Sequence, residues 1–305
     1  MGDQKGAGIL WTDFTFNAWH GCVKVSGGCK NCYADAQDKR FGPSHWGPGA
    51  ARKMMSEAYW RQPLRWNSEA AAAGVRARVF CASMADVFEK LLADHPSAEA
   101  VEEARERLWT LIEATPSLDW LLLTKRLENI HLMSPPVWWG QGFPENVWIG
   151  TSVEDQATAD ERIPHLLKVS ARVRFLSCEP LLGPVDLAAY LGGGYVQIVD
   201  GRTAPMRVNL PPLHWVIAGG ESGPHARPMH PDWARTLRDQ CQAAGVSYFF
   251  KQWGNWQPAS MSDEGYLSAK GQVWDWQDGW MSVNVGKHIA GRLLDGQTWN
   301  EMPER

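Results

Sequence analysis

The sequence predicts an α/β protein: a partial or nearly closed parallel (β/α) barrel of the TIM-like kind, with inserted loops and a C-terminal extension rich in Trp and Gly. Three observations predict this fold class. Short apolar runs recur without alternation, which is typical of strands buried on both faces of a parallel sheet. Amphipathic helical segments separate these runs, as in repeated βαβ units. The number of runs suits an open or nearly closed barrel better than a sandwich.

The expected strands share one pattern, a β-rich apolar run that ends in small or polar residues. After a first strand near residues 9–16, they cover residues 79–86, 120–126, 147–154, 173–179, 215–222 and 247–252. Three segments between the strands, residues 97–115, 156–168 and 231–244, carry apolar residues at helical spacing among charged ones. Gly245 directly follows the last helix, where a C-capping glycine belongs.

Three insertions interrupt this order: residues 40–75, 131–146 and 190–212. The third is predicted to be a hairpin that turns at Asp200-Gly201, a favoured two-residue turn. The strand–helix alternation stops after Trp253. We therefore expect residues 1–253 to form the barrel and residues 254–305 to form an extension packed on it, with a short helix near residues 286–294.

Composition narrows the class of protein. With 305 residues, 44% of them hydrophobic and 21% charged, the chain has the make-up of an ordinary soluble globular protein. A net charge of −4 argues against a phosphate-binding surface over the whole molecule, but it leaves a local basic groove open. No stretch is long and apolar enough to span a membrane, and the N-terminus has no apolar signal core. We expect a cytoplasmic protein with no membrane contact.

Three closely spaced cysteines are the strongest functional signal. Cys22, Cys29 and Cys32 have the spacing C-x6-C-x2-C. Three thiolates can hold one metal centre, and they leave a tetrahedral zinc, or one iron of a four-iron cluster, one ligand short. The alternative is a structural zinc site completed by His20 or a distant side chain. The other cysteines are expected to be inert core residues; they are Cys81, Cys178 and Cys241.

Polar residues follow most of the predicted strands. Active sites of parallel barrels lie at the carboxyl ends of the strands, and the cysteine loop also follows a strand, so sequence order places the thiols on the same rim as these polar ends. The polar strand ends are Ser83, Asp86, Lys125, Arg126, Thr151, Ser152, Glu154, Ser177, Glu179, Gly219–Ser222, Lys251 and Gln252.

Each strand-end signal has a structural alternative. Lys125 and Arg126 could bind a carboxylate or phosphate, or form ion pairs with a neighbouring strand-end acid. Glu154 and Glu179 could bind a ligand, or neutralise those cations. The glycine-rich run 219–223 could form a backbone nest for a ligand, or a tight βα turn.

Six short runs are distinctive: Trp11–Asn17, Trp19–Cys22, Cys29–Tyr33, Ser83–Phe88, Gly219–Gly223 and Ala290–Trp299. A three-cysteine loop after the first strand of a (β/α) barrel resembles the radical S-adenosylmethionine (SAM) superfamily. With these runs the chain resembles more closely an uncharacterised family of phage and prophage proteins related to that superfamily. The resemblance covers nearly the whole chain.

The resemblance implies an enzyme with two cofactors, a [4Fe–4S] cluster held by Cys22, Cys29 and Cys32, and S-adenosylmethionine on the fourth iron. An external one-electron donor would reduce the cluster, and cleavage of the cofactor would give a 5′-deoxyadenosyl radical that takes a hydrogen atom from an unknown substrate. Nucleic acid or a nucleotide derivative is the suggested substrate class, and a phage or host protein a suggested partner. The implied cofactor-binding residues are Tyr33, Ser83, Met84, Asp86, Lys125, Ser152, Glu154 and Glu179.

Two features depart from the superfamily pattern. The first cysteine interval is three residues longer than in the usual C-x3-C-x2-C spacing, and the Gly-Gly-Glu segment lies at residues 219–221 instead of after the second strand. A second hypothesis is a non-enzymatic phage protein that binds nucleic acid and uses zinc or an iron–sulfur cluster for structure. A third, a metal-assisted hydrolase, would need His ligands at strand ends, and no predicted strand end carries one.

Overall fold

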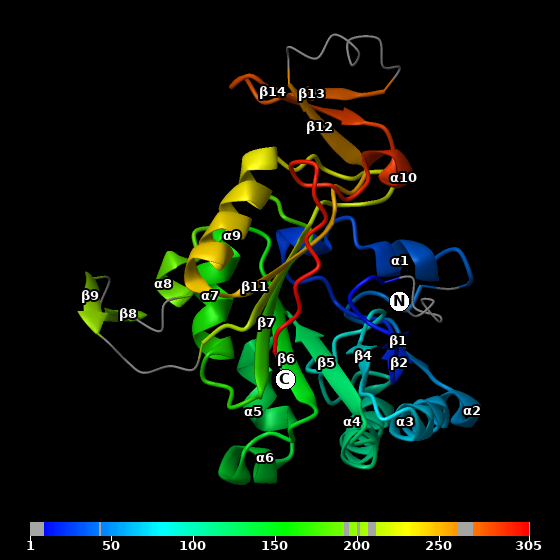
Figure 1. Ribbon diagram of the computed structural model, residues 1–305. Helices are drawn as coiled ribbons and strands as arrows, with labels where there is room; N and C mark the ends of the chain where they lie inside the picture. The colour runs from blue at the N-terminus through cyan, green and yellow to red at the C-terminus, as the bar shows by residue number, and fades with distance from the viewer. Residues whose placement is uncertain are drawn as a thin grey trace. The chain divides into compact units, whose positions relative to one another are not determined.

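The structure is a computed structural model that describes residues 9–42, 44–191, 195–199, 202–206, 212–260 and 271–304. Seven strands form one sheet in the order β1-β4-β5-β6-β7-β10-β11 (Figure 1). Every described strand pair in this sheet is parallel, and the fold is a partial (β/α) barrel, as predicted. The strands are β1 (Phe14–Thr15), β4 (Ala77–Cys81), β5 (Leu118–Thr124), β6 (Val147–Ser152), β7 (Val173–Cys178), β10 (Trp215–Gly219) and β11 (Ser247–Gln252).

Contacts along the chain define two compact units. The first comprises residues 1–151 and 169–173, and the second comprises residues 152–168 and 174–305. The predicted division at residue 253 stays a prediction. No helix among the described residues is both long and apolar enough to cross a membrane.

In the first unit, α3 (Gln62–Ala72) packs on β4 and β5. Aromatic rings fill the space around β1: the ring of Phe16 lies 5.1 Å from Trp60 and 5.6 Å from Trp120, both edge to face. The unit also holds α4 (Ala98–Glu113), α5 (Ile130–Met133) and α6 (Pro136–Gln141). Trp60 and Trp120 therefore belong to the core.

The cysteine loop lies among small elements of the first unit. Strands β2 (Trp19–His20) and β3 (Lys53–Met54) pair antiparallel. Between them come a 3-10 turn η1 (Gly27–Cys29) and helix α1 (Tyr33–Asp38). The insertion at residues 40–75 thus contains β3, α2 (Glu57–Trp60) and α3.

In the second unit, α9 (Pro231–Ala244) packs on β10 and β11, and Gly245 ends it with φ +67°, so this helix and its cap confirm the prediction. Helix α7 (Gln156–Leu166) begins with a capping box formed by Asp155 and Thr158. After α8 (Ala188–Leu191), β8 (Tyr195–Val199) and β9 (Arg202–Met206) pair antiparallel and confirm the hairpin; its turn residues lie outside the described residues.

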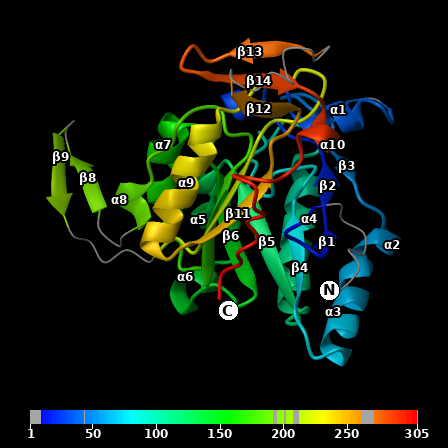
Figure 2. The ribbon, with the colours of Figure 1, turned by 45° about the horizontal axis from the view of Figure 1, so that its top comes forward.

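The C-terminal segment of the second unit holds more structure than the sequence predicted. Strands β12 (Trp256–Ser260), β14 (Trp280–Asn284) and β13 (Val273–Asp275) form an antiparallel sheet, and α10 (Lys287–Ala290) is the expected short helix (Figure 2). These strands were missed because they are short, at three to five residues each. β13 is exposed throughout and β12 contains a proline, so neither carries the apolar run that marks the barrel strands.

Candidate functional site at the cysteine loop

The segment after β4 is tied to the segment that precedes the cysteine loop. The side chain of Asn17 accepts a hydrogen bond from the backbone N–H of Met84 at 2.7 Å and donates to Ser83 Oγ at 3.1 Å. The backbone N–H of Gly21 donates to Met84 O at 2.9 Å, and the Tyr33 hydroxyl donates to Ser83 O, also at 2.9 Å. Three of the predicted cofactor residues, Tyr33, Ser83 and Met84, therefore lie together beside the cysteines, where they also anchor the loop.

Gly21, directly before the first cysteine, permits this close packing. Its φ is +114°, a conformation that L side chains rarely adopt. A Cβ atom at this position would lie 2.3 Å from the carbonyl oxygen of His45 and 2.8 Å from the side chain of Arg52. Any larger residue would therefore push the start of the cysteine loop away from its supports.

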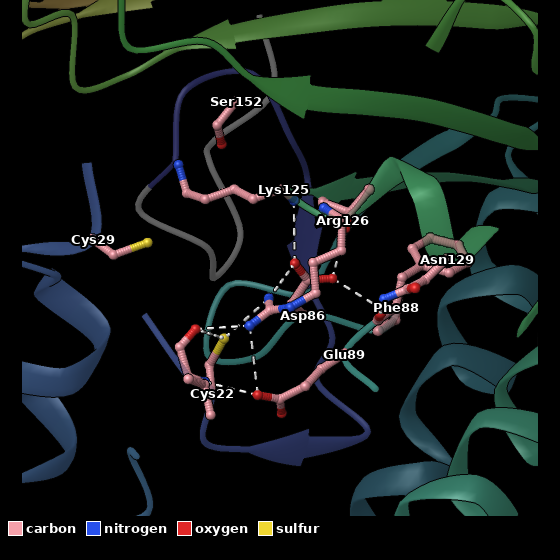
Figure 3. A network of polar contacts seen from close by, with 12 residues as sticks. Cys22, Cys29, Asp86, Phe88, Glu89, Lys125, Arg126, Asn129 and Ser152 are labelled. Carbon is pink, nitrogen blue, oxygen red and sulfur yellow. Dashed lines mark hydrogen bonds and ion pairs between the residues drawn. The ribbon is translucent and has the colours of Figure 1, made fainter. Parts of the chain in front are cut away.

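A buried arginine contacts the first cysteine (Figure 3). Arg126 Nη1 lies 3.5 Å from Cys22 Sγ and 2.8 Å from Asp86 Oδ2, while Nη2 donates to Val23 O at 2.7 Å. Arg126 and Asp86 are only 7% and 5% exposed. The predicted structural pairing of Arg126 with a strand-end acid is thus present, and the same guanidinium also holds the cysteine loop.

Each carboxylate oxygen of Asp86 accepts two hydrogen bonds. Its Oδ1 atom accepts from the hydroxyl of Thr124 at 2.7 Å and from the backbone N–H of Phe88 at 3.0 Å. Its Oδ2 atom accepts from the backbone N–H of Lys125 at 3.1 Å as well as from Arg126. Asp86 therefore joins the end of β5 to the segment after β4, and its role toward a cofactor stays a prediction.

A second buried ion pair continues the network. Arg52 donates from Nε and Nη2 to the carboxylate of Glu89, at 3.0 and 3.1 Å. Glu89 Oε1 also accepts from the backbone N–H of Val23 at 2.7 Å and lies 3.6 Å from Arg126. Both side chains of the Arg52–Glu89 pair are almost fully buried. The residue after Cys22 is thereby held at its N–H by Glu89 and at its carbonyl by Arg126.

The three thiols differ in their electrostatic surroundings. Burial raises the pKa of Cys22 to about 12, and the nearby Arg126 opposes this rise. Burial also raises the pKa of Cys32. Burial acts to raise the pKa of Cys29 too, but the charge of Lys125 and hydrogen bonds from the loop backbone outweigh it, so the net shift is downward.

The three thiols of the loop are the candidate ligands for a metal centre. All three thiols are free and only partly buried, and cationic Arg126 and Lys125 lie near Cys22 and Cys29. Cations close to cysteine ligands stabilise the thiolate form that binds metal. Among the described residues, however, no three His, Cys, Asp or Glu side chains converge closely enough to hold a metal ion. The assignment of the three cysteines as ligands stays a prediction.

In the second unit, the end of β6 carries a buried ion pair. Arg162 Nη1 lies 3.3 Å from both carboxylate oxygens of Glu154 and donates to Ser152 O at 2.8 Å. All three residues are at most 5% exposed. Helix α7 supplies Arg162, a residue that the sequence analysis did not select.

Polar groups also converge at the ends of β7, β10 and β11 in the second unit. Lys251 Nζ contacts both carboxylate oxygens of Glu179, at 2.7 and 2.8 Å. Gln252 Nε2 donates to Glu179 Oε1 at 3.3 Å and to Ser222 Oγ at 3.1 Å. Four predicted strand-end residues therefore form one cluster, with Glu179 at its centre.

The glycine-rich run of the second unit has a packing explanation. A Cβ atom on Gly220 would lie 2.0 Å from Trp253 O, and one on Gly254 would lie 2.1 Å from Glu221 O. Two backbone segments thus touch where each has a glycine. The Glu221 carboxylate binds the guanidinium of Arg227 at 2.6 and 2.8 Å. These contacts favour the tight-turn interpretation of residues 219–223 over a ligand nest.

Sequence reasoning missed several residues that support the loop. Asn17 and Glu89 lay inside or next to motifs already selected, so their polar character was an available signal. Arg52 gave no signal, because it lies in an insertion far along the chain from its partner. The prediction for the remaining cysteines is confirmed: they are fully buried, and they are Cys81, Cys178 and Cys241.

Comparisons with known proteins give one structure and one family. No curated protein matches the chain. A solved structure of a spore photoproduct lyase double mutant with bound AdoMet and dinucleoside spore photoproduct is similar, with 11% sequence identity and a TM-score of 0.43, over 90% of this chain and 68% of that chain. This likeness is too weak to assign an activity. The family model described as "Protein of unknown function (DUF5131)" matches residues 6–303. Because the match spans nearly the whole chain, the protein belongs to this family.

Proposed function

We propose that the protein is a radical SAM-type enzyme in which Cys22, Cys29 and Cys32 hold a [4Fe–4S] cluster that binds S-adenosylmethionine. The observation that carries the proposal is the attachment of the cysteine loop, through Arg126 and Met84, to the segments that follow β5 and β4. Those are the carboxyl ends of parallel strands, where barrel enzymes place their reactive groups. When bound, the cluster would supply the electron that cleaves the sulfonium cofactor to a carbon radical.

The chain's own residues hold and shield this centre. Arg126 and Glu89 fix both backbone polar groups of Val23, so the first thiol is held in a defined position. Arg126 also places a buried positive charge beside Cys22, which offsets part of the negative charge of a thiolate-ligated cluster. Tyr33 anchors the loop after the third cysteine to the segment that follows β4.

Four further residues are proposed to contact the cofactor. Ser152 and Glu154 at the end of β6 offer oxygen atoms to the ribose hydroxyls, and Glu179 offers a carboxylate to the same group or to the substrate. Lys125 would pair with the methionine carboxylate. The support for these roles is that each residue ends a strand of a parallel sheet.

The first test is metal content. We would purify the protein without oxygen, reconstitute it with iron and sulfide, and record the reduced EPR spectrum with and without S-adenosylmethionine. About four irons per chain are expected, with a spectrum that changes when the cofactor is added. The bound iron and the change in the EPR spectrum should both disappear in the Cys22→Ala/Cys29→Ala/Cys32→Ala variant. The Cys241→Ala variant, which loses a thiol buried in the core, is the control that should keep them.

Two outcomes would overturn the proposal. One zinc and no iron would make the three thiols structural and favour the non-enzymatic alternative. An intact cluster that yields no 5′-deoxyadenosine with any of several strong reductants would show that the centre is not a SAM-cleaving one.

A further inference from the structure

Charge is distributed unevenly along this chain. Residues 22–54, which contain the cysteine loop, hold six Lys or Arg residues and two Asp, a net charge of +4 in a chain whose net charge is −4. The rest of the molecule is therefore strongly acidic. An anionic partner would therefore be attracted more strongly to this segment than to the rest of the chain on average.

The acids of this segment are buried, whereas most of its cations are exposed. The two acids of the segment, Asp35 and Asp38, are only 5% and 7% exposed. Asp35 binds the ammonium groups of Lys24 and Lys39 at 3.2 and 2.9 Å, and Asp38 binds the His45 ring at 2.9 Å. Over the described residues between 22 and 54, no carboxylate is exposed. Five cations are: Lys24, Lys30, Lys39, Arg40 and Lys53.

The same segment of the chain also exposes apolar and aromatic side chains. Phe41 is 82% exposed, Tyr33 54% and Val25 48%. Tyr33 directly follows Cys32, and Phe41 lies three residues beyond the end of α1, so both rings belong to the part of the chain that carries the thiols.

We propose that this surface binds single-stranded nucleic acid and brings it to the cysteine loop. We call it the basic loop surface, and it consists of Lys24, Lys30, Lys39, Arg40 and Lys53 with Tyr33 and Phe41. A basic surface interleaved with exposed aromatic rings is the composition that single strands require, because phosphates pair with the cations while unpaired bases stack on the rings. A duplex hides its base faces and could use only the cations. The inference deepens the proposed function by naming its substrate class; the reaction rests on that function, but the binding does not.

The test is fluorescence anisotropy with a labelled oligonucleotide of about 20 nucleotides, measured over a range of salt concentrations. Three alanine substitutions, at Lys30, Arg40 and Lys53, remove charge while leaving the pairs with Asp35 intact. We expect affinity to fall about 100-fold near 0.1 M salt, and the slope of log affinity against log salt to fall by about 2. The matched control removes three exposed cations elsewhere, Arg61, Arg65 and Lys168, and should bind like the unaltered protein.

A second variant tests the rings. Phe41→Ala leaves every charge in place and should weaken single-strand binding about tenfold, with the salt slope unchanged. Circular dichroism of each variant would verify that it is folded. Equal losses in the control triple variant, equal or tighter binding to a duplex, binding to anionic lipid vesicles but not to the oligonucleotide, or no binding at all would each overturn the inference.

Binding is measured on the reconstituted protein and on the variant with all three loop cysteines replaced. Retained binding in the cysteine variant is expected, because the surface does not use the thiols. If the EPR and 5′-deoxyadenosine results hold but the oligonucleotide does not bind, the substrate inference fails and the proposed function stands. If the oligonucleotide binds but no iron is held, the binding surface stands and the proposed function fails.

Discussion

The guanidinium of Arg126 contacts both the thiol of Cys22, at 3.5 Å, and the carbonyl of the next residue, at 2.7 Å. One buried side chain thus holds the first cysteine by its sulfur and by its backbone. It is itself held by Asp86, which is bound to the end of β5. The position of the thiol is therefore coupled to the barrel rather than left to a free loop.

Arg126→Met should lose both stability and metal. The substitution leaves the buried carboxylate of Asp86 without a cation, while Glu89 keeps Arg52, so the free energy of unfolding should fall by about 3–5 kcal/mol. Urea denaturation of the metal-free variant measures this loss. Iron bound per chain after reconstitution should fall as well, and Arg126→Lys should recover part of both, because it keeps the charge but not the planar fork.

Arg162→Met is the matched control for this experiment. Like Arg126, Arg162 is a buried arginine paired with a buried carboxylate, but its partner is Glu154 and it lies in the second unit. Its loss should lower stability by a similar amount and leave iron binding intact. Full iron binding by Arg126→Met would show that the arginine has no role at the cysteine loop.

Gly21→Ala should disrupt the loop, and Gly27→Ala should not. The alanine methyl at residue 21 would meet the His45 carbonyl and force an unfavourable φ, at a cost of about 1–3 kcal/mol or more. At residue 27, in the same loop, nothing lies within 4 Å of an added Cβ. Stability measured by urea denaturation and iron content should both be lower for Gly21→Ala than for Gly27→Ala. Equal behaviour would contradict the close approach at Gly21.

Local pattern predicted most of the barrel, because buried parallel strands are short apolar runs and α9 has a clear apolar face with a glycine cap. Predicted strand ends were too long, however. The strand expected over residues 79–86 ends at Cys81, since the side chain of Asp86 binds backbone N–H groups and so shapes the following segment as a loop. Polar side chains that satisfy backbone donors end strands in a way that hydrophobic pattern does not register.

The candidate site was predictable in its residue types but not in its pairings. Arg126 does pair with a strand-end acid, Asp86, because neighbouring parallel strands end at one edge. The acids that the sequence analysis named as possible partners of Lys125 and Arg126 were Glu154 and Glu179, and these pair with Arg162 and Lys251. Glu89 binds both Val23 and Arg52. These contacts join segments that are distant in sequence, and no local sequence pattern predicts them. The sequence therefore located the cysteine loop, but the contacts that hold the loop became visible only in the structure.

Lys251→Met should destabilise the second unit more than Glu179→Gln. Lys251→Met leaves the largely buried carboxylate of Glu179 without its cation, which costs about 1–3 kcal/mol. Glu179→Gln leaves a neutral amide that can still form a hydrogen bond with Gln252. If Glu179 binds the cofactor as proposed, Glu179→Gln should also weaken S-adenosylmethionine binding to the reconstituted protein, measured by calorimetry. Unchanged affinity would restrict Glu179 to a structural ion pair.

His214 should make stability depend on pH. Burial, together with the charge of Arg174, lowers the pKa of this ring from 6.5 to about 4. The neutral ring accepts a hydrogen bond from the Arg174 backbone N–H at 3.1 Å. Between these two pH values the unfolded ring binds a proton that the folded ring does not. Unfolding therefore takes up a proton, so the free energy of unfolding falls as the pH falls from 6.5 to 4. Below pH 4 the ring is protonated in both states, and its titration changes stability no further.

His214→Gln removes this contribution, and its effect can be isolated by comparison. Chemical denaturation at several pH values should give a shallower dependence for His214→Gln than for the unaltered protein between pH 4 and 6.5. His165→Gln, which replaces an exposed histidine on α7, is the control and should leave the slope unchanged. Because His214 lies far along the sequence from the cysteines and contacts Arg174 within the second unit, iron content should be equal in all three proteins. An unchanged slope in His214→Gln would mean that the folded ring takes up its proton as readily as the unfolded one.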